Sequence, residues 1–316
     1  MSFLSTAVHQ VLEDGQFCVV ATDTPNGPHG TPLVFALSGG RIWLTTSRGS
    51  VKARAWRTDP TMAGLVRSGE LWVAFTGTAR PYDLLDSATW GATVSGAPAI
   101  ARASVRFSKK NARFFAGYAM DAHQVPFAWT PPGRVFVGID VERTALLDET
   151  GVSEGKGRWA GELVSERTFR ARKTGRDPLA ALPFDVSRAI GREGHGSIAI
   201  GGPRGPVALP ARWHAEETAL YVALPGETLA LADTGPSAPV ALTIDRPSAW
   251  RARDMTGAMV QGTGSIHAIA DLGSGKRSAA TIATSIDPDA DALIRIEPRR
   301  LVWWKGWTSG SALVES

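Results

Sequence analysis

The 316-residue sequence contains two copies of one pattern of turns and strands. When positions 178 residues apart are compared, the proline- and glycine-rich turn at residues 25–28 falls on residues 203–206 without a gap. Bulky residues of the strands that follow coincide too, since Trp43 falls on Tyr221. Self-similarity at a fixed separation indicates duplication of a structural unit, so we expect two copies of one unit in this chain.

A second segment repeats at a separation of 157 residues, which pairs Ile139 with Ile296. A glycine-rich, charged stretch lies between the copies, and its glycines argue against a packed strand there. We therefore expect a first unit over residues 1–148, a linker over residues 149–183 and a second unit over residues 184–316.

The order of elements predicts that each unit is a small antiparallel β-barrel. In the first copy, five short hydrophobic runs separated by turn residues precede residue 80, and one helix interrupts them. Residues 83–130 are mostly helical by pattern, most clearly over 108–120, and strand returns over 134–147. The expected fold is mainly β (α+β), with two tandem barrels and flanking helices.

Residues 40–60 hold the strongest candidate for a binding site. A strand ends at a group of hydroxyl residues, and a short helix then begins at Ser50 and ends before Pro60. Hydroxyls, cations and the free N–H groups of a helix N-terminus together favour binding of phosphate. The alternative is that Ser50 only caps a helix whose cations are solvated. The candidate ligands of this phosphate cradle are Thr45, Thr46, Ser47, Arg48, Lys52 and Arg54.

The two copies differ where ligand sites would be. The second has small residues in place of the cradle cations, such as Ala230 at the position of Lys52. Only the second has an aromatic C-terminal strand, with Trp303, Trp304 and Lys305. We expect one cofactor per chain, held between the copies by the cradle of one and the aromatic strand of the other. The alternative is that these tryptophans only pack on the core.

The first copy, by its strand pattern and cradle, resembles the flavin/deazaflavin split β-barrel superfamily that includes pyridoxamine 5′-phosphate oxidase. The resemblance implies that the cradle holds the cofactor phosphate and that the aromatic strand completes the site from the other barrel. It implies FMN as cofactor, with deazaflavin coenzyme F-420 and then haem as alternatives.

The same resemblance favours an oxidoreductase acting on a small organic substrate. A non-catalytic protein that binds haem or another small ligand stays open as an alternative, so enzymatic activity is not decided. A flavin carries the hydride itself, so no catalytic residue is assigned. His29 is interpreted as an exposed turn residue, with contact to a ring or substrate as the alternative.

Composition and motifs narrow the other function classes. The histidines and the single cysteine, Cys18, show no metal-ligand spacing, so we predict no metal site. The net charge of +4 favours anionic ligands, and no interleaved basic and aromatic pattern points to nucleic acid. No apolar run reaches the ~20 residues of a membrane span, and the N-terminus lacks a basic leader, so we expect a cytoplasmic protein. The expected assembly is an intrachain pseudo-dimer that leaves room for a further homodimer.

Overall fold

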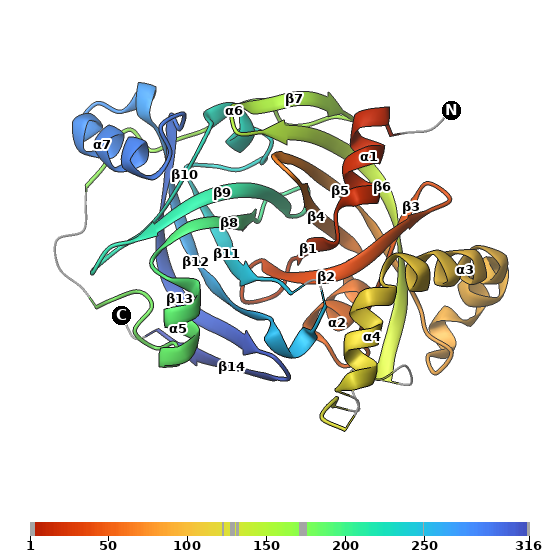
Figure 1. The fold of residues 1–316 in the computed structure, drawn as a ribbon. Helices are drawn as coiled ribbons and strands as arrows, with labels where there is room; N and C mark the ends of the chain where they lie inside the picture. Colours follow the sequence, from red (N-terminus) through yellow and green to blue (C-terminus); the bar gives the residue numbers. More distant parts are fainter. Residues whose placement is uncertain are drawn as a thin grey trace.

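The computed structural model describes residues 4–121, 123–126, 130, 133–170, 176–248 and 250–314. The chain forms two antiparallel barrels that lie side by side (Figure 1). Each barrel has six strands and closes by pairing of its third strand with its sixth, β3 with β6 and β10 with β13. A seventh strand, β7 or β14, extends each sheet at its edge.

The first half begins with a helix whose N-cap, Ser5, accepts a hydrogen bond from the backbone of Val8. Its elements are α1 (Thr6–Asp14), β1 (Phe17–Thr22), β2 (His29–Ser38), β3 (Arg41–Ser47), α2 (Val51–Thr58), β4 (Thr61–Ser68), β5 (Leu71–Tyr82), η1 (Ser87–Thr89), α3 (Trp90–Lys110), α4 (Ala112–Met120), β6 (Arg134–Asp148) and β7 (Gly151–Lys156).

The second half repeats this order with a single helix where the first half has α3 and α4. Its elements are α5 (Phe184–Ile190), β8 (Glu193–Ile200), β9 (Val207–Ala215), β10 (Leu220–Leu224), α6 (Gly226–Leu229), β11 (Ser237–Arg246), η4 (Ala252–Asp254), β12 (Thr256–Ala268), η5 (Ile269–Asp271), α7 (Lys276–Ile286), β13 (Ala292–Lys305) and β14 (Thr308–Leu313).

Strand register confirms the duplication that the sequence predicts. Ile42 pairs with Ile139 in the first barrel, and Leu220 pairs with Ile296 in the second. Ile42 and Leu220 are 178 residues apart, and Ile139 and Ile296 are 157 residues apart. Both repeat separations therefore belong to the same strand pairing, the one that closes each barrel. The fold class expected from the sequence, two tandem split barrels with flanking helices, is therefore the observed one.

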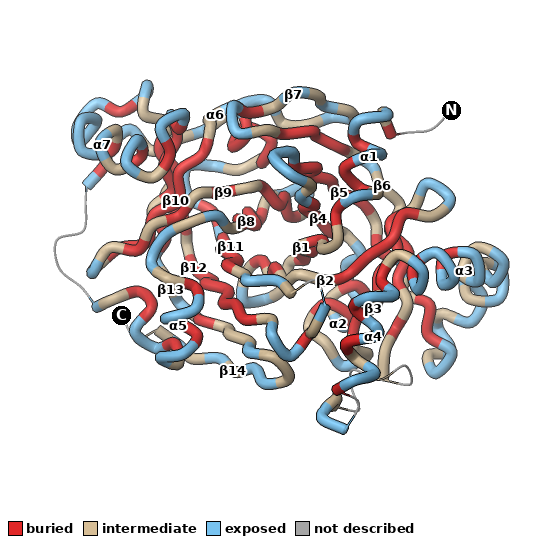
Figure 2. Tube along the Cα trace, viewed as in Figure 1, coloured by how far each residue is buried: buried red, intermediate tan, exposed pale blue. Residues whose placement is uncertain are grey.

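The barrels meet face to face along strands that are almost fully buried, which run through the centre of Figure 2. Polar groups at this contact are paired across it. The side chain of Gln261 donates to the carbonyl of Pro28 at 2.7 Å, and Thr243 Oγ1 donates to the carbonyl of Gly30 at 3.0 Å. Apolar burial and these bonds together fix the position of one barrel on the other.

Part of the linker forms a strand, although its glycines argued against one. Residues Gly151–Lys156 form β7, which lies at the edge of the sheet and pairs with β6 alone among the described strands. Gly155 is exposed, so its missing side chain loses little packing, whereas the buried Gly151 has a positive φ and Glu227 occupies the space beside it.

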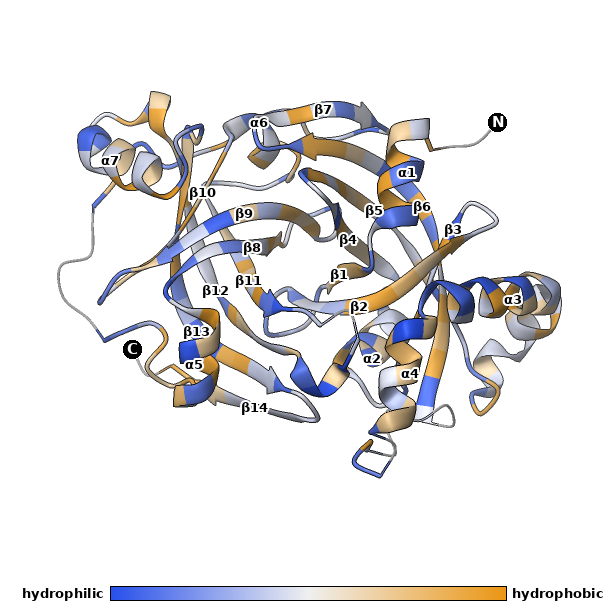
Figure 3. Ribbon diagram, viewed as in Figure 1, coloured by the Kyte–Doolittle hydropathy of each residue, from blue (hydrophilic) through white to orange (hydrophobic). Residues whose placement is uncertain are grey.

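The helices between β5 and β6 cover the outer face of β2, whose residues are largely hydrophobic (Figure 3). Residues 108–120 do not form one continuous helix, because α3 ends at Lys110 and α4 begins at Ala112. The buried residue between them, Asn111, donates from Nδ2 to the carbonyls of Phe35 and Phe107. This fixes the junction of α3 and α4 on β2.

Helix α4 also reaches the second half of the chain. Its Gly117 lies so close to the carbonyl oxygen of Trp250 that a Cβ would be only 2.0 Å away. Arg253 pairs with the buried carboxylate of Asp121 at 3.2 Å at the end of the helix. Among the described residues, no helix is both long enough and apolar enough to pass through a bilayer.

Candidate functional site

A cavity of about 760 Å³ lies where the two halves meet, next to the cradle. Its walls come from β2, β3 and the N-terminus of α2, from α3 and α4, and from residues of η4, β13 and β14 in the second half. This volume lies in the usual range for small-molecule and cofactor sites. Both halves therefore contribute to one chamber.

Hydroxyl groups of the cradle form its polar end. Thr45, Thr46, Ser47 and Ser50 line the cavity where β3 ends and α2 begins. Ser50 caps α2 by accepting from the N–H of Ala53 at 3.1 Å, and its hydroxyl lies 3.0 Å from that of Thr46. The sequence therefore places a capped helix start, with its electropositive end, at the cavity wall.

Lys52 lies on the first turn of α2, is buried, and lines the same end. Its Nζ donates to Thr31 Oγ1 on β2. Burial, with the positive charge of Arg134 as a second cause, lowers the pKa of Lys52 to about 8. A buried ammonium held by one neutral hydroxyl is poorly compensated, so an anion there would stabilise it.

Arg134, the first residue of β6, is a second cation at this wall. Its guanidinium donates to Thr45 Oγ1 at 2.9 Å and to the carbonyl of Thr45 at 2.7 Å. Burial lowers its pKa, and the nearby Tyr118 opposes that effect. Among the described residues, neither Lys52 nor Arg134 has an ion pair with a carboxylate, and no acidic residue lines the cavity.

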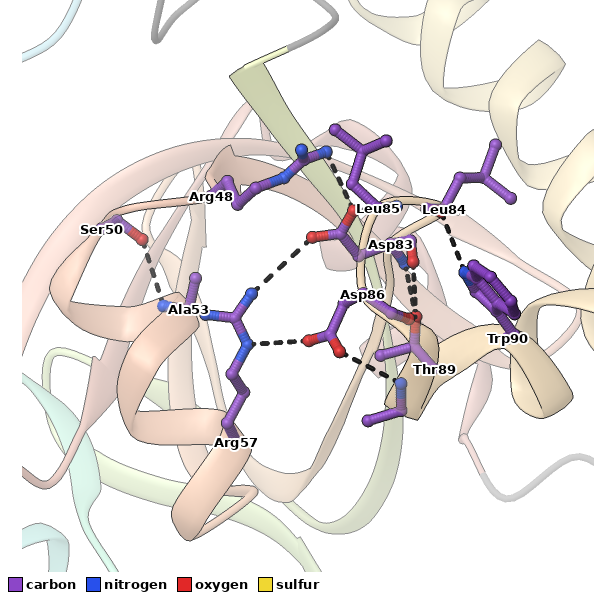
Figure 4. A network of polar contacts seen from close by, with 11 residues as sticks. Arg48, Ser50, Ala53, Arg57, Asp83, Leu84, Leu85, Asp86, Thr89 and Trp90 are labelled. Atoms are coloured by element: carbon purple, nitrogen blue, oxygen red, sulfur yellow. Dashed lines mark hydrogen bonds and ion pairs between the residues drawn. The ribbon is translucent and has the colours of Figure 1, made fainter.

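The other two cradle cations point elsewhere. Arg48 pairs at 2.9 Å with Asp83, a carboxylate whose side chain is 1% exposed, and Arg57 approaches the same carboxylate at 3.7 Å (Figure 4). Arg54 is exposed on α2, and neither Arg48 nor Arg54 lines the cavity. Arg48 therefore holds the loop after β5, and neither Arg48 nor Arg54 contributes to the cavity wall.

Trp303 and Trp304 line the cavity from the second half, as the sequence predicts for the aromatic strand. Their indoles occupy space left by glycines on neighbouring strands: a Cβ on Gly310 would be 2.5 Å from Trp303, and one on Gly257 would be 2.3 Å from Trp304. Lys305 instead forms an exposed pair with Asp185 at 2.5 Å, outside the cavity.

Aromatic side chains form the other end of the cavity. They come mainly from the helices between β5 and β6, and Tyr118 and Trp307 meet in a T-shaped arrangement with 5.0 Å between ring centres. The aromatic residues of the first half that line the cavity are Phe17, Phe107, Phe114, Phe115, Tyr118 and Phe136.

His29 lies at the first position of β2 and lines the cavity, so its reading as an exposed turn residue was wrong. Burial, together with the charges of Lys52 and Arg300, lowers the pKa of His29 to about 3. Its imidazole is therefore neutral near neutral pH, with one nitrogen able to donate and the other to accept. Within the described residues, no group of three or more His, Cys, Asp or Glu gathers as a metal site.

The corresponding place on the second barrel is covered by the linker. Ala230, the counterpart of Lys52, accepts a hydrogen bond at its carbonyl from the N–H of Gly161 at 3.0 Å. Trp159 and Leu163 of the same segment pack on the hydrophobic core that includes the second barrel. The duplicated cradle position has thus become a packing surface for the linker.

Sequence reasoning missed Arg134 and the aromatic helices. Arg134 is the first residue of the strand expected over 134–147, and barrel closure pairs it with Ser47 at the end of β3. That pairing was the available signal, because a strand that closes the barrel against β3 must begin where β3 ends.

Residues 4–145 match the family model described as pyridoxamine 5′-phosphate oxidase. Three solved structures show the extent of similarity. A conserved hypothetical protein from Mycobacterium tuberculosis is 24% identical over 46% of this chain and 85% of its own, with a TM-score of 0.34. An FMN-binding protein related to pyridoxamine 5′-phosphate oxidase from Nostoc punctiforme is 18% identical over 47% and 86%, with a TM-score of 0.35. A protein named F-420 reductase is 16% identical over 45% and 98%, with a TM-score of 0.30. No curated protein matches the sequence.

Proposed function

We propose that the chain, whose residues 4–145 match the pyridoxamine 5′-phosphate oxidase family model, is an oxidoreductase that binds one flavin-type cofactor in the cavity between its halves. The observation that carries the proposal is a pair of cations, the buried Lys52 and the partly buried Arg134, at one end of a cavity with no acidic residue among its described lining. Buried charge without a partner is costly, and a phosphate monoester would compensate both cations.

In this proposal the phosphate lies at Lys52, Arg134 and the hydroxyls of Thr46 and Ser50, beside the N-terminus of α2. The cofactor ring lies toward Trp303 and Trp304, where aromatic stacking contributes about 0.5–1.5 kcal/mol beyond area burial. The flavin supplies hydride or electron transfer. The protein residues bind the phosphate, orient the ring and exclude water from the cavity. FMN is the first choice and the deazaflavin coenzyme F-420 the second.

The test is titration of cofactor-free protein with FMN and with F-420, followed by fluorescence. Lys52→Met removes the buried cation, and Arg54→Met removes an exposed cation two residues away on the same helix. Loss of a charge-assisted bond of about 1.5–3 kcal/mol predicts ten- to a hundredfold weaker binding for Lys52→Met and unchanged binding for Arg54→Met. Binding of neither cofactor by the parent protein would overturn the proposal.

The second candidate function is a non-catalytic haem protein on the same fold. The observation in its favour is His29, whose neutral imidazole lines the cavity and has the protonation state that iron requires of a ligand. A Soret band that appears on adding haem and is lost in His29→Ala, with no binding of FMN or F-420, would support this function over the first.

A further inference from the structure

We propose that the aromatic end of the cavity binds a neutral aromatic substrate, an inference that rests on the proposed function because it places this substrate next to the cofactor. This aromatic end comprises Phe17, Phe107, Phe114, Phe115, Tyr118 and Phe136, and Val34 and Met255 belong to the same hydrophobic cluster.

The geometry of the aromatic end suits a flat ring. Phe17 and Phe114 meet edge to face with 5.9 Å between ring centres, and Phe107 and Phe136 do so at 5.7 Å. A planar aromatic molecule can add edge-to-face or stacked contacts to rings that are packed in this way. Aliphatic chains gain burial there but lack this pairing.

The aromatic end and the phosphate-binding end are separate along β2. Thr31, which accepts from Lys52, and Val34, which pairs with Phe17, are three residues apart on this strand. A strand rises about 3.3 Å per residue, so the two positions are about 10 Å apart. A phosphate group at Lys52 therefore does not itself fill the aromatic end, and the proposed function places the cofactor ring toward Trp303 and Trp304.

The charges of the cavity lining favour binding of a neutral molecule over a charged one. The titratable residues that line the cavity are His29, Lys52, Tyr118 and Arg134, and none of the described lining residues is acidic. A cationic substrate would lose its hydration without gaining a counter-charge, while an anionic one would be drawn to Lys52 and Arg134 in competition with the cofactor phosphate. A neutral aromatic molecule neither loses the hydration of a charge nor competes with the cofactor phosphate.

One polar substituent on the ring has partners available. Ser104 and Ser108 lie four residues apart on α3 and both line the cavity. Residues at this spacing are neighbours on one helical face, so their hydroxyls form a small polar strip beside the aromatic rings. The proposed substrate is thus an aromatic compound with an uncharged hydrogen-bonding group.

Calorimetric titration of the full chain in phosphate buffer, without cofactor, tests this with three matched probes: naphthylmethanol, naphthylmethylammonium and naphthoate. Phe115→Asp places a charge at the aromatic end, where Phe115 is 37% exposed and the change is tolerable for folding. Val105→Asp is the control, since Val105 is on α3, 70% exposed and not among the lining residues. Circular dichroism verifies that each variant is folded.

The inference predicts that naphthylmethanol binds at least about tenfold more tightly than either charged probe and at least about tenfold more weakly to Phe115→Asp than to Val105→Asp. Equal binding of the ammonium probe, or an unaffected Phe115→Asp, would overturn it. Lys52→Met separates the two proposals, because it is expected to lose FMN and keep naphthylmethanol. FMN binding without naphthylmethanol binding contradicts this inference alone; naphthylmethanol binding without FMN or F-420 contradicts the proposed function alone.

Discussion

Lys52 and Arg134 are 82 positions apart in the sequence, yet both line the wall of one cavity, and the charge of Arg134 adds to burial in lowering the pKa of Lys52 to about 8. Two like charges kept together without an acidic partner among the described residues destabilise the empty protein. Such an arrangement persists where binding an anion is the function of the site.

Lys52→Met should therefore stabilise the cofactor-free protein while weakening cofactor binding. The unfolded chain has a Lys52 pKa of 10.5 and the folded chain about 8. Below pH 8 the folded state bears the full cost of the buried charge, about 1–3 kcal/mol, and the cost disappears as pH rises toward 10.5 because the unfolded state then holds more protons. Urea unfolding at about pH 7 and pH 10 should show a gain for Lys52→Met that shrinks at the higher pH. A gain that is absent, or equal at both values, would show that Lys52 is adequately compensated in the empty cavity.

Arg48→Met should lower stability without changing cofactor affinity. Removing Arg48 leaves the buried carboxylate of Asp83 with the N–H of Leu85 and the longer contact to Arg57 among the described residues, and an undercompensated buried carboxylate costs about 1–3 kcal/mol. The measurement combines urea unfolding with FMN titration, and Arg54→Met serves as the exposed control. A tenfold loss of FMN affinity with normal stability would show instead that Arg48 binds the phosphate.

Gly117→Ala should loosen α4 from the second half of the chain. The added Cβ would meet the carbonyl oxygen of Trp250 at 2.0 Å, so the helix or the loop must move, at about 1–3 kcal/mol. Gly91→Ala, on α3 with nothing within 4 Å of its Cβ, is the matched control and should be neutral or slightly stabilising. Thermal unfolding and hydrogen exchange of α4 measure the effect, and equal stability of both variants would mean that α4 is not fixed by this contact.

Gly310→Ala should displace the ring of Trp303, because the new Cβ would be 2.5 Å from the indole. If Trp303 contacts the cofactor ring, affinity falls by about the 0.5–1.5 kcal/mol of a stacking contact, which is up to roughly tenfold. Gly91→Ala is again the control. Trp303→Ala measures the full effect of losing the indole. If this variant bound FMN as tightly as the parent protein, Trp303 would not contact the cofactor.

The barrel fold follows from the sequence because repetition constrains it twice. Trp43 and Tyr221, related by the repeat, are both fully buried outside their barrels' interiors, and the pairs that close the barrels have the predicted separations. The positions of strands and helices in the first barrel depend on local patterns of turns, caps and hydrophobic runs, so they too can be predicted from the sequence.

The site was less predictable because it depends on side-chain direction and on distant partners. The sequence does not distinguish Arg48, Lys52 and Arg54, which are all cations near the start of α2. Of these three residues, Lys52 alone lines the cavity. Arg48 is diverted by Asp83, whose position depends on the course of the chain after β5. Arg134 reaches Thr45 across 89 residues, and no local pattern contains that contact.

The direct test of one cofactor site shared by both halves is the number of cofactor molecules that each full-length chain binds at saturation, measured by titration calorimetry with FMN and with F-420. The account predicts one equivalent of one of these cofactors per chain, since the cradle position of the second barrel is covered by the linker. Two equivalents per chain, or none of either cofactor, would contradict it.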